Sequence, residues 1–536
     1  RRSVLVAGGA LAATAATSAG PAAAAAGAFR HGVASGDPLS AGVVLWTRVT
    51  PTEESAPGSG LGPDVRVRWE VATDDRFRRV VRRGEVSTGP ARDHTVKVDV
   101  TGLSPATRYA YRFRLGGETS PTGRTATAPA AGAAVPRLRL GVVSCANWQA
   151  GYFSAYRLLA ERGDLDAVVH LGDYLYEYAP GEYQARDVVV RPHDPPTEIT
   201  TLADYRRRHA QYKTDPDLQR LHAQVPFVVT WDDHESANDA YSGGAENHTE
   251  GAEGAWGTRR GWSQQAYAEW MPVRYEAGGR LYRRLAYGSL ASLTMLDLRT
   301  YRDRQPESPL DPAQSDTGRT ITGAEQREFL LAGLTQAGPQ WKLVGNPVMI
   351  SPVRFPSGLS PAQAGAAAEM TGPAEGGVAY NVDQWDGYPV ERRLVLDHLE
   401  AGGVRDTVFL TGDIHSAWAC DVPDDPATYP VDGRSLATEL VCTSVTSDNL
   451  DDITRTAPRT SSIAVEEAFK ANNPHVRYLD FDSHGYSVLD VTPERVQMDW
   501  YVLSERADPR ATSVRSTSWT VAAGTQKVAP ATGGIA

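Results

Sequence analysis

Three apolar runs, each followed at once by residues that commonly bind metals, most constrain the fold of this chain. The runs are LGVVS, AVVHL and VFLTG, at residues 140–144, 167–171 and 408–412. Near-continuous apolar runs are typical of parallel strands buried on both faces, and open α/β sheets place their ligand sites at the carboxyl ends of such strands. The sequence therefore predicts an α/β domain with a metal site formed by the residues that follow these runs: Cys145, Asp173, Tyr176, Asp413 and His415.

The spacing within the segments supports convergence on one point. Asp173 and Tyr176 are three residues apart, so a turn can aim both at one ion. Asp413 and His415 are two apart, so an extended backbone would project both to the same side. A fourth segment, WDDHE at 231–235, adds the carboxylate of Asp233. Because adjacent cations can activate a nucleophile and neutralise phosphoryl oxygens, this arrangement predicts a two-metal site for phosphoryl chemistry.

Each residue also has a purely structural interpretation. A single cysteine after a strand is more often a small buried hydrophobic residue than a ligand. An aspartate at a strand end often caps a helix by accepting from backbone amides. The co-occurrence of four clusters with different ligand types favours the metal interpretation.

Further along the chain, the order of the motifs resembles a known family. GDxxY, an HE-containing turn, W-x-x-V-x-N and GDIH follow one another as in the calcineurin-like metallophosphoesterase superfamily, and most closely as in the PhoD-like alkaline phosphatases and related phospholipase D enzymes. HGVASGDP at 31–38, NHTEGAEGAW at 247–256 and DQWDGY at 383–388 match as well. The resemblance covers about Phe29 to Arg506 and implies a four-layer α/β/β/α catalytic domain.

Departures from the wider superfamily pattern indicate the metals. The usual Asp-x-His is replaced by Cys145, and the distal VxxH histidine aligns with Asn346. By resemblance, the first site is the ferric site of the family, with Fe³⁺ bound by Cys145, Asp173, Tyr176 and His415. At the second site oxygen ligands replace nitrogen, which favours Ca²⁺ bound by Asp173, Asp233, Asn346 and Asp413. Asn238 is a further amide that could reach calcium, and it could equally cap a loop.

The expected catalytic residue is His234. The resemblance gives this histidine the role of stabilising phosphate or protonating the leaving alkoxide, work that an imidazole can do near its own pKa. Glu235, the next residue, could orient it. Candidates for a phosphate-binding guanidinium are Arg157, Arg299 and Arg302, and no spacing selects one of them.

The chain divides into four regions. Residues 1–28 begin with two arginines and continue through an Ala-rich stretch, as in a twin-arginine signal peptide with a small-residue cleavage region, so we expect export by that machinery and secretion. Ala and Gly make this stretch poorly hydrophobic, so a stable membrane anchor is not expected. Residues 29–130 alternate at period two and resemble a fibronectin or immunoglobulin-like β-sandwich. Residues 128–136 could be a linker, the catalytic domain spans 137–506, and the Ser-, Thr-, Ala- and Gly-rich tail at 507–536 is expected to be partly disordered.

The three cysteines fit an exported protein. Cys420 and Cys442 flank the GDIH region and could form a disulfide in an oxidising compartment. Cys145 would then be the free thiolate that its role as a ligand requires.

The predicted function is that of a secreted metal-dependent phosphoester hydrolase acting on mono- and diesters with a metal-bound hydroxide. The alternative is a phospholipase D that cleaves phosphatidylcholine-type lipids at the same site, and a third hypothesis is a non-catalytic surface binding protein. The net charge of −11 argues against an extended nucleic-acid groove. We expect a monomer that acts on a small-molecule phosphoester or phospholipid.

Overall fold

The computed structural model describes residues 27–183, 188–360, 364 and 377–535. The predicted signal peptide, residues 1–28, lies outside this part except for its last two residues. Among the described residues, no helix combines the length and the apolar character needed to cross a membrane.

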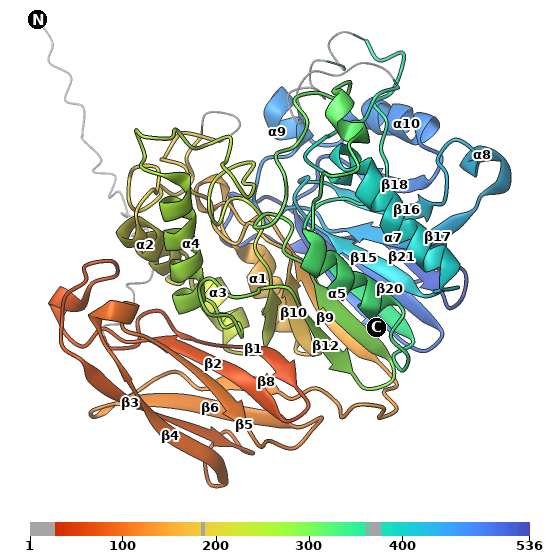
Figure 1. Ribbon diagram of the computed structural model, residues 1–536. Coiled ribbons are helices and arrows are strands. Elements are labelled where there is room, and N and C mark those ends of the chain that lie inside the picture. Colours follow the sequence, from red (N-terminus) through yellow and green to blue (C-terminus); the bar gives the residue numbers. More distant parts are fainter. Residues whose placement is uncertain (1–26, 184–187, 361–363, 365–376, 536) are drawn as a thin grey trace, which may run out of the picture.

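Two β-sheets packed face to face form the centre of the molecule (Figure 1). In spatial order, the first sheet contains β22 (Val528–Pro530), β21 (Ser513–Ala522), β20 (Arg495–Leu503), β19 (Gly485–Val491), β9 (Leu138–Val143), β10 (Ala167–His170), β11 (Phe227–Val229), β1 (Val33–Leu39), β2 (Gly42–Arg48) and β5 (Thr95–Thr101). The second contains β12 (Arg283–Tyr287), β13 (Ala291–Met295), β14 (Trp341–Asn346), β15 (Thr407–Thr411), β17 (Ser435–Val441), β16 (Ala417–Pro423) and β18 (Val476–Asp480). Val142 and Val169 of the first sheet share one apolar core with Leu293 and Leu410 of the second.

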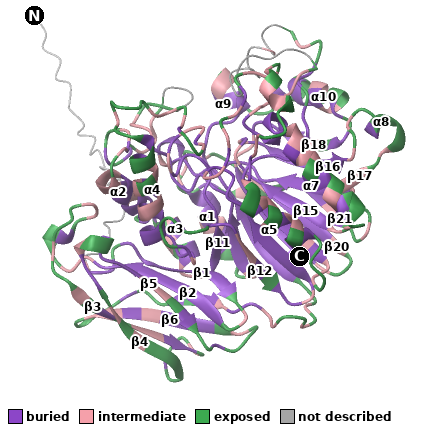
Figure 2. Cartoon of the chain, viewed as in Figure 1, coloured by how far each residue is buried: buried purple, intermediate pink, exposed green. Residues whose placement is uncertain are grey.

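Helices cover the two outer faces. The first sheet carries α1 (Ser154–Arg162), α2 (Leu202–Tyr212), α3 (Pro216–His222) and α4 (Trp256–Trp270), and the second carries α5 (Ala324–Leu334), α7 (Pro389–Ala401) and α10 (Ser462–Asn472). Two short helices, α8 (Tyr429–Asp432) and α9 (Leu450–Thr454), also occur among the described residues. Buried residues concentrate in the sheets and on the inward faces of the helices (Figure 2). The four-layer α/β/β/α expectation is confirmed.

Local sequence explains where the helices start. The segments YFSAYRLLAERG and TLADYRRRHAQYK form α1 and α2. At α2 the side chain of Thr201 accepts from the backbone nitrogen of Asp204, and the Asp204 carboxylate accepts from the backbone nitrogen of Thr201. This capping box satisfies two backbone donors that the first turn leaves unpaired.

The N-terminal region is a β-sandwich, as predicted. Its outer sheet consists of β4 (Val80–Thr88), β3 (Val65–Ala72), β6 (Arg108–Leu115) and β7 (Glu118–Thr119), with β8 (Gly123–Ala126) beside β6. This sheet packs on β1, β2 and β5 through a core that includes Val43, Val67 and Tyr111. The hydroxyl of Tyr109 accepts from the backbone nitrogen of Ser104 at 2.9 Å, which is the turn contact expected for an immunoglobulin-like sandwich.

The inner sheet of this sandwich continues into the catalytic domain. β1 pairs in parallel with β11 at Gly36 and Phe227, so one sheet crosses the predicted boundary. A side chain at Gly36 would place its Cβ 1.8 Å from the carbonyl oxygen of Pro272, so this close approach requires glycine. The Asp37 carboxylate, also on β1, accepts from Arg283 of β12 at 2.6 and 2.9 Å. The two regions are thus joined by backbone pairing and by a partly buried ion pair.

The expectation of a partly disordered tail is wrong. β21 pairs with β20 along its length, β22 pairs with β21, and Trp519 and Val521 are buried in the core between the sheets. Ser, Thr, Ala and Gly suggested disorder by composition. Interspersed Val, Thr and Trp favour strands, and a neighbouring strand offers them a surface to pack on.

The expected disulfide between Cys420 and Cys442 is also wrong, because both cysteines are free and buried. Cys420 lies opposite Glu439 across the β16–β17 pair, three residues away from Cys442. Cys442 belongs to the core between the sheets, whereas Cys420 packs under α10 on the other face of the sheet. The sheet itself therefore separates the two sulfurs.

Thiol labelling checks this correction. We expect the protein, unfolded with chelator but without reductant, to take up three alkyl groups, because no two sulfurs are bonded in the fold. The measurement is intact mass before and after alkylation, with a fully reduced sample as the control. Uptake of only one group by the unreduced sample would show that two of the cysteines form a disulfide.

Candidate metal centre

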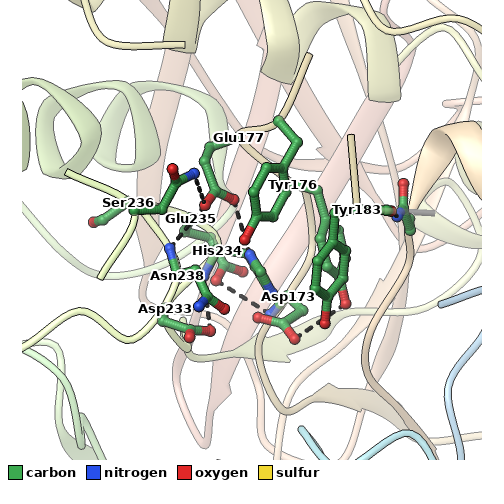
Figure 3. Close-up of polar contacts among 12 residues, drawn as sticks. Asp173, Tyr176, Glu177, Tyr183, Asp233, His234, Glu235, Ser236 and Asn238 are labelled. Atoms are coloured by element: carbon green, nitrogen blue, oxygen red, sulfur yellow. Dashed lines mark hydrogen bonds and ion pairs between the residues drawn. The ribbon is translucent and has the colours of Figure 1, made fainter. Parts of the chain in front are cut away.

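The four predicted segments meet where the strands of the two sheets end. Cys145 follows β9, Asp173 follows β10 and Asp233 follows β11, and these three strands are parallel neighbours. Asp413 and His415 follow β15 of the facing sheet. Figure 3 shows Asp173, Tyr176, Asp233 and His234 from the first sheet turned toward one another. The topology thus brings together residues that are about 270 positions apart in the sequence.

The residues assigned to the first site converge. The ligand atoms of Cys145, Asp173 and His415 all lie within 4.8 Å of one another. The Tyr176 hydroxyl lies 3.2 Å from Oδ2 of Asp173 and 3.3 Å from Nε2 of His415. A thiol, a carboxylate, a phenol and an imidazole therefore surround one small space.

The tautomer of His415 suits a ligand. Its Nδ1 lies 2.9 Å from the backbone carbonyl oxygen of Asp448, which can only accept, so Nδ1 carries the proton and Nε2 keeps its lone pair toward the site. Burial lowers the pKa of His415 to about 3, so the ring is neutral at ordinary pH. A neutral imidazole is the form that binds metals.

A second group of atoms lies beside the first. Carboxylate oxygens of Asp173, Asp232, Asp233 and Asp413 lie within 4.8 Å of one another, so Asp173 belongs to both groups. Asp232 was not predicted as a ligand, although its position beside Asp233 in the WDDHE segment was a usable signal. An all-carboxylate set of this kind suits a hard cation.

The two predicted amide ligands have other contacts in this structure. The Asn346 amide nitrogen donates to the Val348 carbonyl oxygen, and its Oδ1 accepts from Nε1 of Trp385 at 3.0 Å. The Asn238 amide nitrogen donates to Glu246 at 3.3 Å. Their roles as calcium ligands stay predictions.

Strained backbone positions four of the predicted ligands. The φ angles of Cys145, Asp173, Asp413 and His415 are 58°, 53°, 64° and 48°, in the left-handed region that residues other than glycine rarely adopt. Each such residue costs about 1–3 kcal/mol, and such strain persists where the surroundings fix it, often at functional sites. The extended backbone expected at Asp413 and His415 is therefore wrong: the two side chains converge through a tight bend.

The buried acids fit bound cations. Among the described residues, Oδ1 of Asp173 is buried and has no hydrogen-bond partner. Burial raises the pKa of Asp173 and of Cys145 well above their ordinary values, because it removes the water that would solvate their ionised forms. A cation would supply the missing partner and favour the ionised ligands.

One arginine compensates part of this charge. The Arg299 guanidinium donates to both oxygens of Asp232, at 2.6 and 3.0 Å, and lies 3.7 Å from both Asp233 and Asp413. It also pairs with Asp383, as does Arg302. Arg157, on α1, instead donates to the carbonyl oxygen of Ala511. The three candidate phosphate-binding arginines are thus committed to partners within the protein.

His234 lies next to both groups, but Glu235 does not orient it. Nδ1 of His234 is 2.8 Å from Oε2 of Glu177, and both side chains are buried. The Glu235 carboxylate accepts instead from the backbone nitrogens of Asp173, Tyr174 and Asp232, at 3.1, 2.7 and 2.9 Å, and so fixes the ligand loops. Burial alone would lower the pKa of His234, but Asp233, Glu177 and Asp173 outweigh it and raise the pKa well above its ordinary value.

The loop after β17 supports the centre from the facing sheet. Oγ of Ser447 donates to the carbonyl oxygen of Cys145 at 3.0 Å and lies 2.6 Å from the Tyr176 hydroxyl oxygen. Asp448, the next residue, supplies the carbonyl oxygen that holds His415. The sequence did not reveal this loop, because a single hydroxyl and a backbone carbonyl form no recognisable motif.

Comparison with known proteins gives the family. The model of the PhoD-like phosphatase family matches residues 140–500, and that of the PhoD-like phosphatase N-terminal domain matches residues 13–129. Alkaline phosphatase D of Bacillus subtilis (strain 168) is 37% identical over 493 residues, which cover 90% of this chain and 79% of that protein. A solved structure of PhoD aligns with a TM-score of 0.83 at 35% identity, covering 95% of this chain and 92% of the other. The chain therefore belongs to the PhoD-like phosphatase family and is a phosphoric ester hydrolase.

Proposed function

We propose that this phosphatase hydrolyses phosphate mono- and diesters with two kinds of metal ion, Fe³⁺ and Ca²⁺. The observation that carries the proposal is the pair of adjacent ligand groups that share Asp173. Cys145, Tyr176 and His415 complete the mixed sulfur, oxygen and nitrogen set that suits Fe³⁺. The carboxylates of Asp232, Asp233 and Asp413 complete the oxygen set that suits Ca²⁺. When bound, such ions supply nucleophile activation and neutralise charge on phosphoryl oxygens.

His234 is the proposed general acid. One of its ring nitrogens lies within 4.8 Å of carboxylate oxygens of Asp173 and Asp233, so the ring borders the space where a substrate phosphate would sit. Because Glu177 holds Nδ1, Nε2 is left to donate a proton to the leaving alkoxide or a hydrogen bond to the phosphate. An imidazole held by a carboxylate in this way keeps one orientation during the reaction.

The substrate range and the cellular setting belong to the same proposal. Phosphatidylcholine-type lipids would need the same attack at phosphorus, so phospholipase D activity is the alternative at this site. Export through residues 1–28 and a monomeric state also stay predictions. A non-catalytic binding role is disfavoured, because the ligand groups and His234 are assembled together.

Metal analysis tests the two sites separately. We expect Tyr176→Phe to abolish the visible tyrosinate-to-iron absorption while calcium stays bound. We expect Asp413→Asn to lose calcium and to lower kcat by at least about a hundredfold, because a catalytic metal contributes several kcal/mol. The measurements are inductively coupled plasma mass spectrometry, the absorption spectrum and turnover of 4-nitrophenyl phosphate.

The same metal analysis of two further variants tests whether the two amide side chains bind calcium. Asn346→Ala and Asn238→Ala should lose calcium only if these side chains are ligands. Finding two zinc ions in the wild-type protein, with no calcium requirement, would contradict the assignment of both sites.

The acid role predicts a dependence on the leaving group. We expect His234→Ala to lower kcat by about a hundredfold or more, the usual scale of acid–base catalysis, with the larger loss for alkyl esters because alkoxides leave poorly without a proton. Glu177→Gln should show the same pattern with a smaller loss of about tenfold. Steady-state kinetics on an alkyl and a nitrophenyl phosphate provide the measurement.

Glu325→Gln is the matched control for Glu177→Gln. Glu325 is an exposed glutamate in the first turn of α5 and lies outside the candidate metal centre, so the kinetics of this variant should match the wild type. Equal losses on both esters for His234→Ala would assign this residue to phosphate binding instead of proton donation.

A further inference from the structure

A tyrosine outside the predicted site stands directly beside its reactive side chains. The ring centroid of Tyr183 lies 5.1 Å from that of His234 and 5.7 Å from that of Tyr176. It lies 6.4 Å from the ring of His415, edge to face. Figure 3 shows Tyr183 next to Asp173 and Tyr176. The ring therefore borders both the first ligand group and the proposed acid.

Tyr183 forms a boundary of the site with solvent. It remains 39% exposed, whereas His234, Asp173 and Tyr176 beside it are buried. Its ring stacks on that of Tyr178, with centroids 4.8 Å apart and planes 2° apart. Because Tyr178 and Tyr176 both lie against its ring, Tyr183 is held as a wall at the edge of the site.

Buried amides hold this wall in place. Oε1 of Gln149 accepts from the backbone nitrogen of Gly181 at 3.0 Å, and its Nε2 donates to the carbonyl oxygen of Glu182. Nδ2 of Asn147 donates to the carbonyl oxygen of Tyr183 at 3.3 Å. Gln149 and Asn147 are completely buried, so the surrounding protein fixes both amide groups in place. The φ of Tyr183, 48°, lies in the left-handed region, which such anchoring sustains.

We infer that Tyr183 sets the width of the leaving group that the site accepts. The inference rests on the proposed function: if His234 protonates the leaving oxygen, the rest of the leaving group must lie alongside the His234 ring, where Tyr183 stands. Alkyl and single-ring leaving groups would fit beside the Tyr183 ring, whereas fused two-ring groups would clash with it. Gln149 is a positioning residue in this arrangement, because it acts on the substrate only through the 181–183 segment.

The test compares two monoesters whose leaving groups are aryl alcohols of different width. 4-Nitrophenyl phosphate carries one ring and 4-methylumbelliferyl phosphate carries a fused pair. We expect Tyr183→Ala to raise kcat/KM for the wider ester, relative to the narrower one, by about tenfold, the lower end of what one misfitted group costs in a pocket. Tyr183→Phe keeps the ring and should restore the wild-type ratio. Gln149→Ala should shift the ratio in the same direction as Tyr183→Ala.

The outcomes separate this inference from the function on which it rests. If the wild-type protein hydrolyses both esters and Tyr183→Ala leaves their ratio unchanged, with metal content and thermal unfolding as in the wild type, the inference is overturned and the function stands. A wild-type protein that hydrolyses neither ester would overturn both. A ratio that changes equally in Tyr183→Ala and Tyr183→Phe would assign the effect to the hydroxyl. It would also contradict the inference that the Tyr183 ring limits the width of the leaving group. Because Tyr183 is partly exposed, its truncation should leave the fold intact.

Discussion

Buried negative charge around Asp173 is the constraint on which the rest of the centre depends. Asp232 and Asp233 share this space, and ionised carboxylates in a protein interior are stable only when paired. Arg299 supplies one positive charge, mainly to Asp232. One oxygen of Asp173 is buried and has no hydrogen-bond partner among the described residues, so it is free to bind a cation. Metal binding and the final packing of this region are therefore expected to be coupled.

Because these buried carboxylates must be held close together, many backbone groups fix the loops that carry them. Left-handed residues at the strand ends turn the ligands inward, against their intrinsic preference. Glu235 ties the loops after β10 and β11 together through three backbone nitrogens. Ser447 and Asp448 bring support from across the molecule. A site built in this way is held before substrate arrives, which is what electrostatic catalysis needs.

Residues that follow directly on the ends of buried strands could be predicted from the sequence, whereas contacts between residues that only the fold brings together could not. Cys145, Asp173, Tyr176 and His415 were recognisable because each follows a buried run or its first turn. Glu235 was suggested as the partner of His234 because it is the neighbour in sequence, whereas the fold makes Glu177 the neighbour in space. The disulfide expectation failed because alternation along adjacent strands puts Cys420 and Cys442 on opposite faces of the sheet. The tail was misjudged because composition does not reveal that β20 offers it a partner.

The sheet that continues from β11 into β1 has a consequence for the N-terminal sandwich. β11 leads directly into the segment that carries Asp232, Asp233 and His234, and β1 covers the edge of β11. Without the sandwich, β11 would become an edge strand with unpaired backbone groups, and such edges recruit strands from other chains. The sandwich therefore prevents the edge of the catalytic sheet from pairing with strands of other chains. A catalytic fragment lacking the first hundred or so residues would carry the loop of Asp232 and Asp233 next to an exposed strand edge that is prone to self-association.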